Sequence, residues 1–595
     1  MKFSRSRSNN GYIGTDHRFP WGDGRLSPSK HYNSVMDGYE LNRFESSEYQ
    51  PPKEWRALPN ITEGEQKFAG VYAIYNDTNL VALSATTSSG NYIVDWGDGT
   101  TGSFASNAQA NKVYTAETYA GLTSDVFRDY KTVVITVTPA TANLTAINLS
   151  AQYNQLVSGR SLPSARSRPW LNVKTAGANI TSMNYGNCND LEQIEFVGIN
   201  NITSGYAHFN GLRSLRRIVR YYTGKMGRFD LCFNGTQNLR TIPQFDLSGL
   251  SGNAFGLSQI FYGALGLQYI PWMDTSNVKY FTQMFYQCSS LRTIPPLDLS
   301  NALDCSGMFI GCNSLEYVPY LNTRNCTNFS SMFQYCISLK TSPGLNTSNG
   351  TNFSLMFYDA NFSESYPYDF SKGTNFDRTY YRIENLNKVP PLDVSSGITF
   401  SQMFIGCSTL TKVDLRGLTG SSSTINGRAF DYMFYLCSSL REVYGLSFAN
   451  AVNFEECFSN TALDHIPTTY PVGITTGIRT TSFVRAFNSM SYLKTVGNFN
   501  MSAFEGSTYS SVYTGLFGSC ISLMNIGLTG LQHNFSISSS QFGGTALNNL
   551  YNSLAVVGVS GAGAKTVTVT GNWGATAAYG HNPAIAIAKG WSVTN

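Results

Sequence analysis

The residues that could carry acid–base or metal chemistry are few in this sequence, and their spacing does not group them. Charged residues make up 13% of the 595 residues, and the six histidines are scattered at positions 17, 31, 208, 465, 533 and 581. No histidine is paired with a cysteine or carboxylate at metal-ligand spacing. No nucleophile-elbow or phosphate-loop motif occurs in a strand–helix context. We therefore expect a protein that is not an enzyme and that carries no cofactor.

Two carboxylates lie close enough in sequence to consider a cation. Asp95 and Asp98 belong to the stretch VDWGDGT at 94–100. Carboxylate oxygens are the ligands that Ca²⁺ prefers. Asp and Gly are also the residues that tight turns favour for their backbone conformation. We favour turn chemistry and predict no metal site, with calcium as the alternative.

The cysteines follow a pattern that argues against disulfides. Cysteine is a small and often buried hydrophobe, and the total of eleven is odd. We therefore predict free, packed thiols. Seven of them share one position, three residues after an aromatic residue, namely Cys188, Cys288, Cys312, Cys336, Cys407, Cys437 and Cys520.

The element that positions these cysteines is a repeat, in which the same residue types recur at a nearly constant interval. Its pattern is F-x-x-C-x-x-L-x-x-I-P, and its aromatic position can be followed from Tyr185 to Phe542. Such a repeat indicates a solenoid, in which equivalent residues of successive coils stack into ladders. We expect a short parallel strand in each coil that ends at the proline, which cannot donate to a ladder. The clearest ladder positions are Phe285, Cys288 and Leu291, then Phe309, Cys312 and Leu315, then Phe333, Cys336 and Leu339.

A Met often precedes the Phe, and turns of the type D-x-S-N separate the coils, as at 274–277. With these two features, the pattern resembles the BspA-type leucine-rich repeat. The resemblance implies a solenoid used for binding and implies no catalysis. Several coils are longer than the usual interval. The clearest insertions are Gly420–Gly427 and Pro471–Thr481. In this alignment they share one edge of the solenoid, and we expect that edge to be the binding side.

The sequence pattern of the residues before the repeats predicts β-strands. Tyr92–Trp96 alternates and breaks at Gly97, and Lys131–Val137 is a further strand. With the turn at 94–100, residues 67–140 resemble a PKD-type β-sandwich. The stretch Asn143–Ser150 also alternates. We expect it to start the solenoid or to cap its first coil.

Residues 1–66 show little periodicity and are rich in Ser, Asn, Gly, Tyr and Arg, so they cannot bury enough surface to fold alone. They are either a disordered tail or an extended arm that becomes ordered on a partner, and the aromatic and arginine residues favour the arm. We expect these residues to anchor the arm to a partner protein: Arg5, Arg7, Tyr39, Phe44, Tyr49 and Trp55.

The residues after the last coil no longer follow the repeat pattern. A helix is expected over 547–554, a strand over 565–570 and a second helix over 583–589. The predicted fold is therefore mainly β, with an N-terminal extended arm (1–66), a PKD-like β-sandwich (67–140), a leucine-rich-repeat solenoid (141–546) and a small αβ C-terminal cap (547–595).

The composition of the chain argues against some classes of function. With a net charge of +4 and only 13% charged residues, we expect no strong field for nucleic acid across the body of the protein. No apolar run is long enough for membrane insertion. Met1–Gly14 is polar and basic, without the apolar core of a secretion signal. The segment at 54–68 also resembles phage tail-fibre-like proteins.

We predict a bacteriophage virion structural protein on the particle exterior, a tail fibre or tail-associated adhesin. Its arm would contact other virion proteins, and its solenoid would bind a host surface glycan or protein; a homo-oligomer is compatible with this. The alternatives are a capsid decoration or head-fibre protein and a bacterial surface adhesin.

Overall fold

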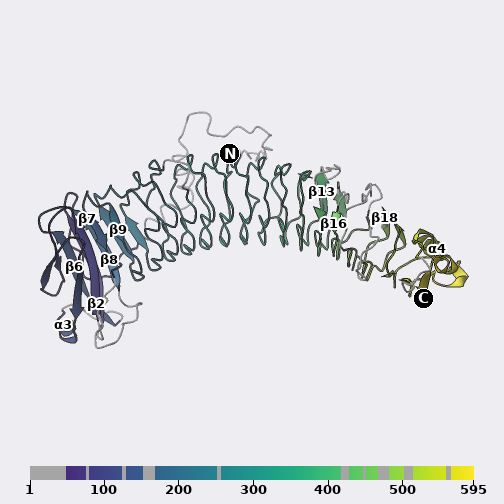
Figure 1. Ribbon diagram of the computed structural model, residues 1–595, viewed down its shortest axis with the longest axis horizontal. Helices are drawn as coiled ribbons and strands as arrows, with labels where there is room; N and C mark the ends of the chain where they lie inside the picture. The colour runs from purple at the N-terminus through teal and green to yellow at the C-terminus, as the bar shows by residue number, and fades with distance from the viewer. Residues whose placement is uncertain are drawn as a thin grey trace, which may run out of the picture. The chain divides into compact units, whose positions relative to one another are not determined.

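The computed structural model describes residues 49–75, 79–122, 129–151, 168–250, 256–416, 428–445, 451–466, 482–500, 513–557 and 565–595. The chain divides between Gln50 and Pro51 into two units. Almost all of the described residues belong to the second unit, which is mainly β (Figure 1). Within the described residues, no helix is long and apolar enough to cross a membrane.

Two sheets pack face to face around one apolar core at the start of the second unit. The first sheet has the strand order β11-β10-β8-β1-β6-β3-β4, and the second has the order β5-β2-β7-β9. The helix α3 (Ala116–Gly121) follows β5. The strands are β1 (Lys67–Tyr75), β2 (Asn79–Thr87), β3 (Tyr92–Asp95), β4 (Thr101–Phe104), β5 (Gln109–Tyr114), β6 (Tyr130–Pro139), β7 (Leu144–Asn148), β8 (Trp170–Ala176), β9 (Ser182–Asn184), β10 (Gln193–Val197) and β11 (Arg217–Val219).

Both sheets continue directly into the repeats. Strand β8 pairs antiparallel with β1 and parallel with β10. Strand β7 likewise pairs antiparallel with β2 and parallel with β9. The first coil therefore has paired strands beside it instead of open edges. Residues 143–150, which were expected to start the solenoid or to cap its first coil, contain β7, and β7 pairs with a strand on each side.

The segment that follows Gln50 packs on the β region. The side chain of Trp55 is only 7% exposed, and its indole N–H donates to the hydroxyl oxygen of Tyr130 at 3.1 Å. Ile61 is buried against the same region. The prediction that Trp55 anchors the chain to another protein is therefore wrong, because its ring completes the core of its own chain. Tyr49 is half-buried, and the other predicted anchors lie outside the described residues: Arg5, Arg7, Tyr39 and Phe44.

Most of the described coils contain two consecutive β-turns around their aromatic residue. In the coil of Phe285, the N–H of Met284 donates to Phe281 O and the N–H of Cys288 donates to Phe285 O, at 3.1 and 3.0 Å. The N–H of Phe285 itself donates to Met308 O of the next coil at 2.8 Å. These bonds between coils give the regular stack in Figure 1.

The strands of the coils are fewer than predicted. Between β11 and β12 (Leu392–Asp393), the described coil residues form only isolated bridges, such as Leu321 with Leu345. The expectation of a strand in each coil is therefore wrong for these coils. Most of them carry a proline after the Ile position, which removes a backbone donor. Asp414 and Tyr444 replace that proline in the coils that form β13 (Lys412–Arg416) and β15 (Glu442–Tyr444). The later strands are β13 (Lys412–Arg416), β14 (Arg428–Ala429), β15 (Glu442–Tyr444), β16 (Ala451–Asn453), β17 (His465–Ile466), β18 (Thr495–Asn500) and β19 (Asn525–Thr529).

The last two described ranges, 513–557 and 565–595, contain at their C-terminal side three parallel strands and three short helical elements. The strands are β20 (Phe535–Ser536), β21 (Lys565–Thr568) and β22 (Trp591–Thr594), in that order in the sheet. The helices are α4 (Gly544–Ser553), the 3₁₀ helix η3 (Ala577–Tyr579) and α5 (Ala584–Ile587). The two insertions that were expected to mark the binding edge, Gly420–Gly427 and Pro471–Thr481, lie outside the described residues.

Candidate functional site: a polar groove on the coils

The aromatic ladder fixes the stacking of the coils that carry the site. The rings of Phe285 and Phe309 lie 5.4 Å apart with an interplanar angle of 9°, and those of Phe309 and Phe333 lie 5.2 Å apart at 9°. None of the three side chains is exposed. Leu291, Leu315 and Leu339 are buried in the same core. The predicted stacking of these positions is confirmed.

A second aromatic ladder, which sequence analysis missed, runs beside the first. Its rings stack in parallel with centroids 4.9–5.6 Å apart. The signal was present in the sequence, because each member lies four residues before a member of the first ladder. The members are Phe329, Phe353, Phe376, Phe400, Phe430, Phe454 and Phe483.

The cysteine position has a role beyond filling space. Cys312 Sγ donates to Phe285 O of the preceding coil at 3.1 Å, and Cys288 and Cys336 make the same bond at 3.2 and 3.3 Å. All eleven cysteines are buried and free. Burial raises the pKa of the Cys312 thiol well above its ordinary value. The thiols at the shared cysteine position, such as Cys312, therefore act as neutral donors that join neighbouring coils.

One coil is shorter than its neighbours. The interval from Phe357 to Tyr380 is one residue shorter than the interval from Phe333 to Phe357. The residue is lost after the cysteine position, because Phe362 takes the buried Leu position only two residues after Ala360. In the preceding coil, the corresponding extra residue is Ile337, whose side chain is 53% exposed. The surface is therefore recessed at the short coil.

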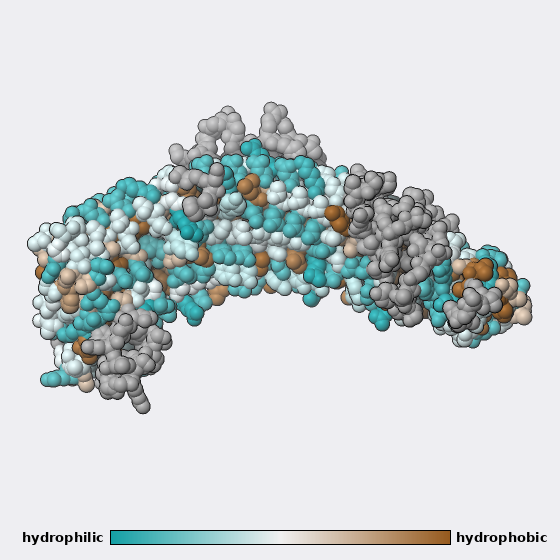
Figure 2. Space-filling model, in the orientation of Figure 1, coloured by the Kyte–Doolittle hydropathy of each residue, from teal (hydrophilic) through white to brown (hydrophobic). Residues whose placement is uncertain are grey.

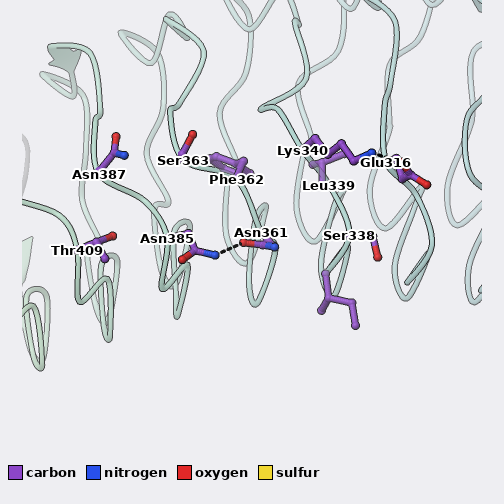
Figure 3. A pocket seen from close by; sticks show the side chains of 11 residues that line it. Glu316, Ser338, Leu339, Lys340, Asn361, Phe362, Ser363, Asn385, Asn387 and Thr409 are labelled. Carbon is purple, nitrogen blue, oxygen red and sulfur yellow. Dashed lines mark hydrogen bonds and ion pairs between the residues drawn. The ribbon is translucent and has the colours of Figure 1, made fainter.

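An open groove of about 830 Å³ lies over the short coil and its neighbours. Figure 3 shows two rows of mostly polar side chains, one from each of several successive coils. The first row is Glu316, Lys340, Ser363 and Asn387, and the second is Ser338, Asn361, Asn385 and Thr409. The buried side chains of Leu339 and Phe362 complete the lining, together with Ile337 at one end.

The polar groups of the groove are only partly engaged with one another. Asn385 Nδ2 donates to Asn361 Oδ1 at 2.8 Å. Lys340 Nζ donates to a Glu316 carboxylate oxygen, and this bond lowers the pKa of Glu316. Within the described part of the chain, the side chains of Ser363 and Asn387 make no hydrogen bond. They are exposed and can serve a ligand.

Exposed tyrosines belong to the same coils as the groove. Tyr317 is 56% exposed and Tyr320 is 45% exposed. A Cβ atom on Gly344 would lie 3.1 Å from the Tyr320 ring and 3.4 Å from the Tyr366 ring. Tyr366 in turn packs on the buried Tyr368, with ring centroids 5.4 Å apart. Gly344 therefore leaves room for a tyrosine from the coil on each side.

The carboxylates that could have bound calcium are engaged in their own turn. Asp95 Oδ1 accepts from the N–H of Gly97 at 3.0 Å. Asp98 Oδ1 accepts from the N–H of Thr100 at 3.0 Å, and Asp98 Oδ2 forms an ion pair with Lys112 at 2.7 Å. Burial alone would raise the pKa of Asp98, but the bonds from Lys112 and Thr100 outweigh burial and lower it. These contacts fit the turn interpretation.

The stacked coils define a repeat solenoid, and one family profile agrees with this. The family described as "Mycoplasma protein of unknown function, DUF285" matches residues 201–320, 255–367, 279–391 and 363–467. Together these matches span 201–467, less than half of the chain, and they include the whole groove. No curated protein matches the sequence.

Several solved structures of leucine-rich-repeat type resemble the chain only remotely. The leucine-rich repeat domain of APL1B is 11% identical, with 62% of this chain and 81% of that chain covered and a TM-score of 0.18. The TLR13–ssRNA13 complex is 14% identical, with coverage of 66% and 65% and a TM-score of 0.14. The PEPR1–AtPEP1 complex is 12% identical, with coverage of 73% and 83% and a TM-score of 0.12.

Proposed function

We propose that this protein is a bacteriophage virion structural protein on the particle exterior, a tail fibre or tail-associated adhesin whose coils bind the host surface. The observation that carries the binding role is the polar groove, which lies where one coil is a residue shorter than the coils on either side. A solenoid presents such a surface on a scaffold in which each coil is held by its neighbours.

The proposal is supported by the rigidity of the coils and by the polar character of their surface. Two buried aromatic ladders and thiol bonds between coils hold the groove residues at fixed positions. A preorganised surface binds with a smaller entropic cost. The visible face of the coils is mainly hydrophilic, with isolated apolar spots (Figure 2), which suits a polar ligand.

The groove favours binding without turnover. Its only carboxylate is Glu316, which is paired with Lys340. Hydrolysis of a glycosidic bond by the common mechanisms requires two carboxyl groups across the bond. The groove also contains no histidine or cysteine that could act as a base or nucleophile.

The remaining parts of the proposal follow from the sequence. Residues 1–50, which form the first unit, would attach the chain to other virion proteins. The two-sheet region would be a PKD-like spacer between that attachment and the coils. Trp55 is excluded from the attachment because it is buried in its own chain.

The experiment compares particles of the encoding phage that carry the full chain with particles from a mutant phage that lacks residues 1–50. Antibody against the coils should label the tails of the full-chain particles and should not label the mutant particles. Label on the capsid would instead support the head-fibre alternative. Absence of the full chain from purified particles would overturn the virion proposal.

A further inference from the structure

We propose that the groove over the short coil binds a neutral oligosaccharide of the host envelope, which lies along the stack with one side against the exposed tyrosines. This inference rests on the proposed host-binding function and specifies its ligand. It depends on three properties of the described residues, namely the type of polar group, the balance of charge and the presence of aromatic rings in the same coils.

The polar groups match the hydroxyl groups of a sugar. An amide side chain both donates and accepts hydrogen bonds, and so does a serine hydroxyl. Asn361 and Asn385 are exposed and bonded to each other, which orients the two amides and leaves further donors and acceptors on both. Ser363 and Asn387 in the other row have no side-chain partner within the described part of the chain. A sugar hydroxyl could therefore bond to both rows.

The groove carries no net charge. Glu316 and Lys340 are the only charged residues that line it, and they neutralise each other. Beside the groove, Glu364 and Lys388 form a second ion pair at 3.5 Å. An anionic polysaccharide would find no unpaired cation in the lining, because the Lys340 ammonium group is already bonded to a carboxylate. The charge balance thus favours a neutral ligand.

The spacing of the groups suits a chain of sugar rings. Successive coils of a parallel stack are about 4.8 Å apart, which is similar to the length of one pyranose unit. Asn361, Asn385 and Thr409 come from three successive coils in one row. An extended oligosaccharide lying along the stack could therefore present one ring to each coil.

The tyrosines add the apolar contact that sugar rings require. The C–H face of a pyranose packs on an aromatic ring while its hydroxyls bond to polar groups, and tyrosine combines a broad apolar face with a polar end. Tyr366 lies three residues after Ser363, or about 10 Å along an extended chain. Tyr317 directly follows Glu316, and its ring is mostly exposed. These rings come from the coils that line the groove, and the proposal places them beside the bound sugar.

The test uses the full chain on an array of neutral and anionic bacterial polysaccharides, followed by calorimetric titration with the tightest neutral binder. The Asn387→Ala variant should bind about tenfold more weakly, because one hydrogen bond to the ligand is lost. The matched control is Asn313→Ala, an exposed amide on a neighbouring coil that does not line the groove. It should bind as the unchanged protein does.

A parallel measurement of binding to host cells separates the two proposals. If the full chain binds cells but neutral polysaccharides do not compete, or if Asn387→Ala and Asn313→Ala bind alike, the oligosaccharide inference is overturned and host binding stands. A preference for anionic polysaccharides also overturns it. If the full chain does not bind host cells, the proposed function itself fails.

Discussion

Replacing Phe309 with alanine tests the stacking of the coils most sharply. The ring is fully buried and is flanked by two parallel rings with centroids 5.4 and 5.2 Å away. Loss of a buried phenyl ring costs about 3–5 kcal/mol, because transfer energy is lost and a cavity remains. Phe309→Leu keeps part of the apolar volume but loses both stacking contacts, which are worth about 0.5–1.5 kcal/mol each. We expect it to be destabilised less than Phe309→Ala.

The assay is denaturant unfolding combined with hydrogen exchange, since long repeat arrays can depart from two-state unfolding. Exchange should accelerate mainly in the coils next to Phe309, because each coil contacts only its neighbours. Tyr317→Ala, at a ring 56% exposed in the same coil, serves as the control and should change stability by under about 0.5 kcal/mol. If Phe309→Ala proves as mild as Tyr317→Ala, the stacking derived from the repeat is wrong.

Three further predictions concern other parts of the chain. Thiol labelling should modify few of the eleven buried cysteines in the native protein and all eleven after denaturation without reductant; a count far below eleven would reveal bridges. Trp55→Ala should destabilise the β region by about 3–5 kcal/mol. Trp55→Phe, which loses the bond to Tyr130, should be less destabilising. Normal melting of Trp55→Ala would instead support the prediction that this residue belongs to the arm. Burial lowers the pKa of His208 to about 4, below the ordinary value of about 6.5, so acid titration should show stability falling as the pH drops from about 6.5 towards 4. His208→Met, with the residue that several later coils have before the aromatic position, should remove that dependence, and an unchanged pH profile would contradict the assignment.

The repeat could be predicted from the sequence because its pattern is local and recurs many times. Phe285, Phe309 and Phe333 were placed correctly, since equal spacing forces equivalent residues to stack. Trp55 was misplaced because composition alone does not show which surface an aromatic ring will cover. The missing strands follow from the prolines, whose effect on pairing was foreseen only as an end to each strand.

The groove was harder to find from the sequence. Insertions, as at Gly420–Gly427, were expected to mark the binding edge, because inserted residues often form binding loops. The signal that mattered was the shortened interval between Phe357 and Tyr380. Only the structure shows that Ser363 and Asn361 flank the recess left by the absent residue, because that depends on how neighbouring coils surround it.

The most direct test restores the missing residue. An isoleucine inserted between Ala360 and Asn361 gives this coil the full length and the exposed side chain of its predecessor, so the chain should fold as before with the groove filled. Binding to host cells is then measured for the full chain with and without the insertion, and hydrogen exchange confirms that the coils remain intact. We predict that the insertion abolishes binding while exchange in distant coils is unchanged. Undiminished binding by a correctly folded insertion variant would contradict the assignment of the groove as the binding site.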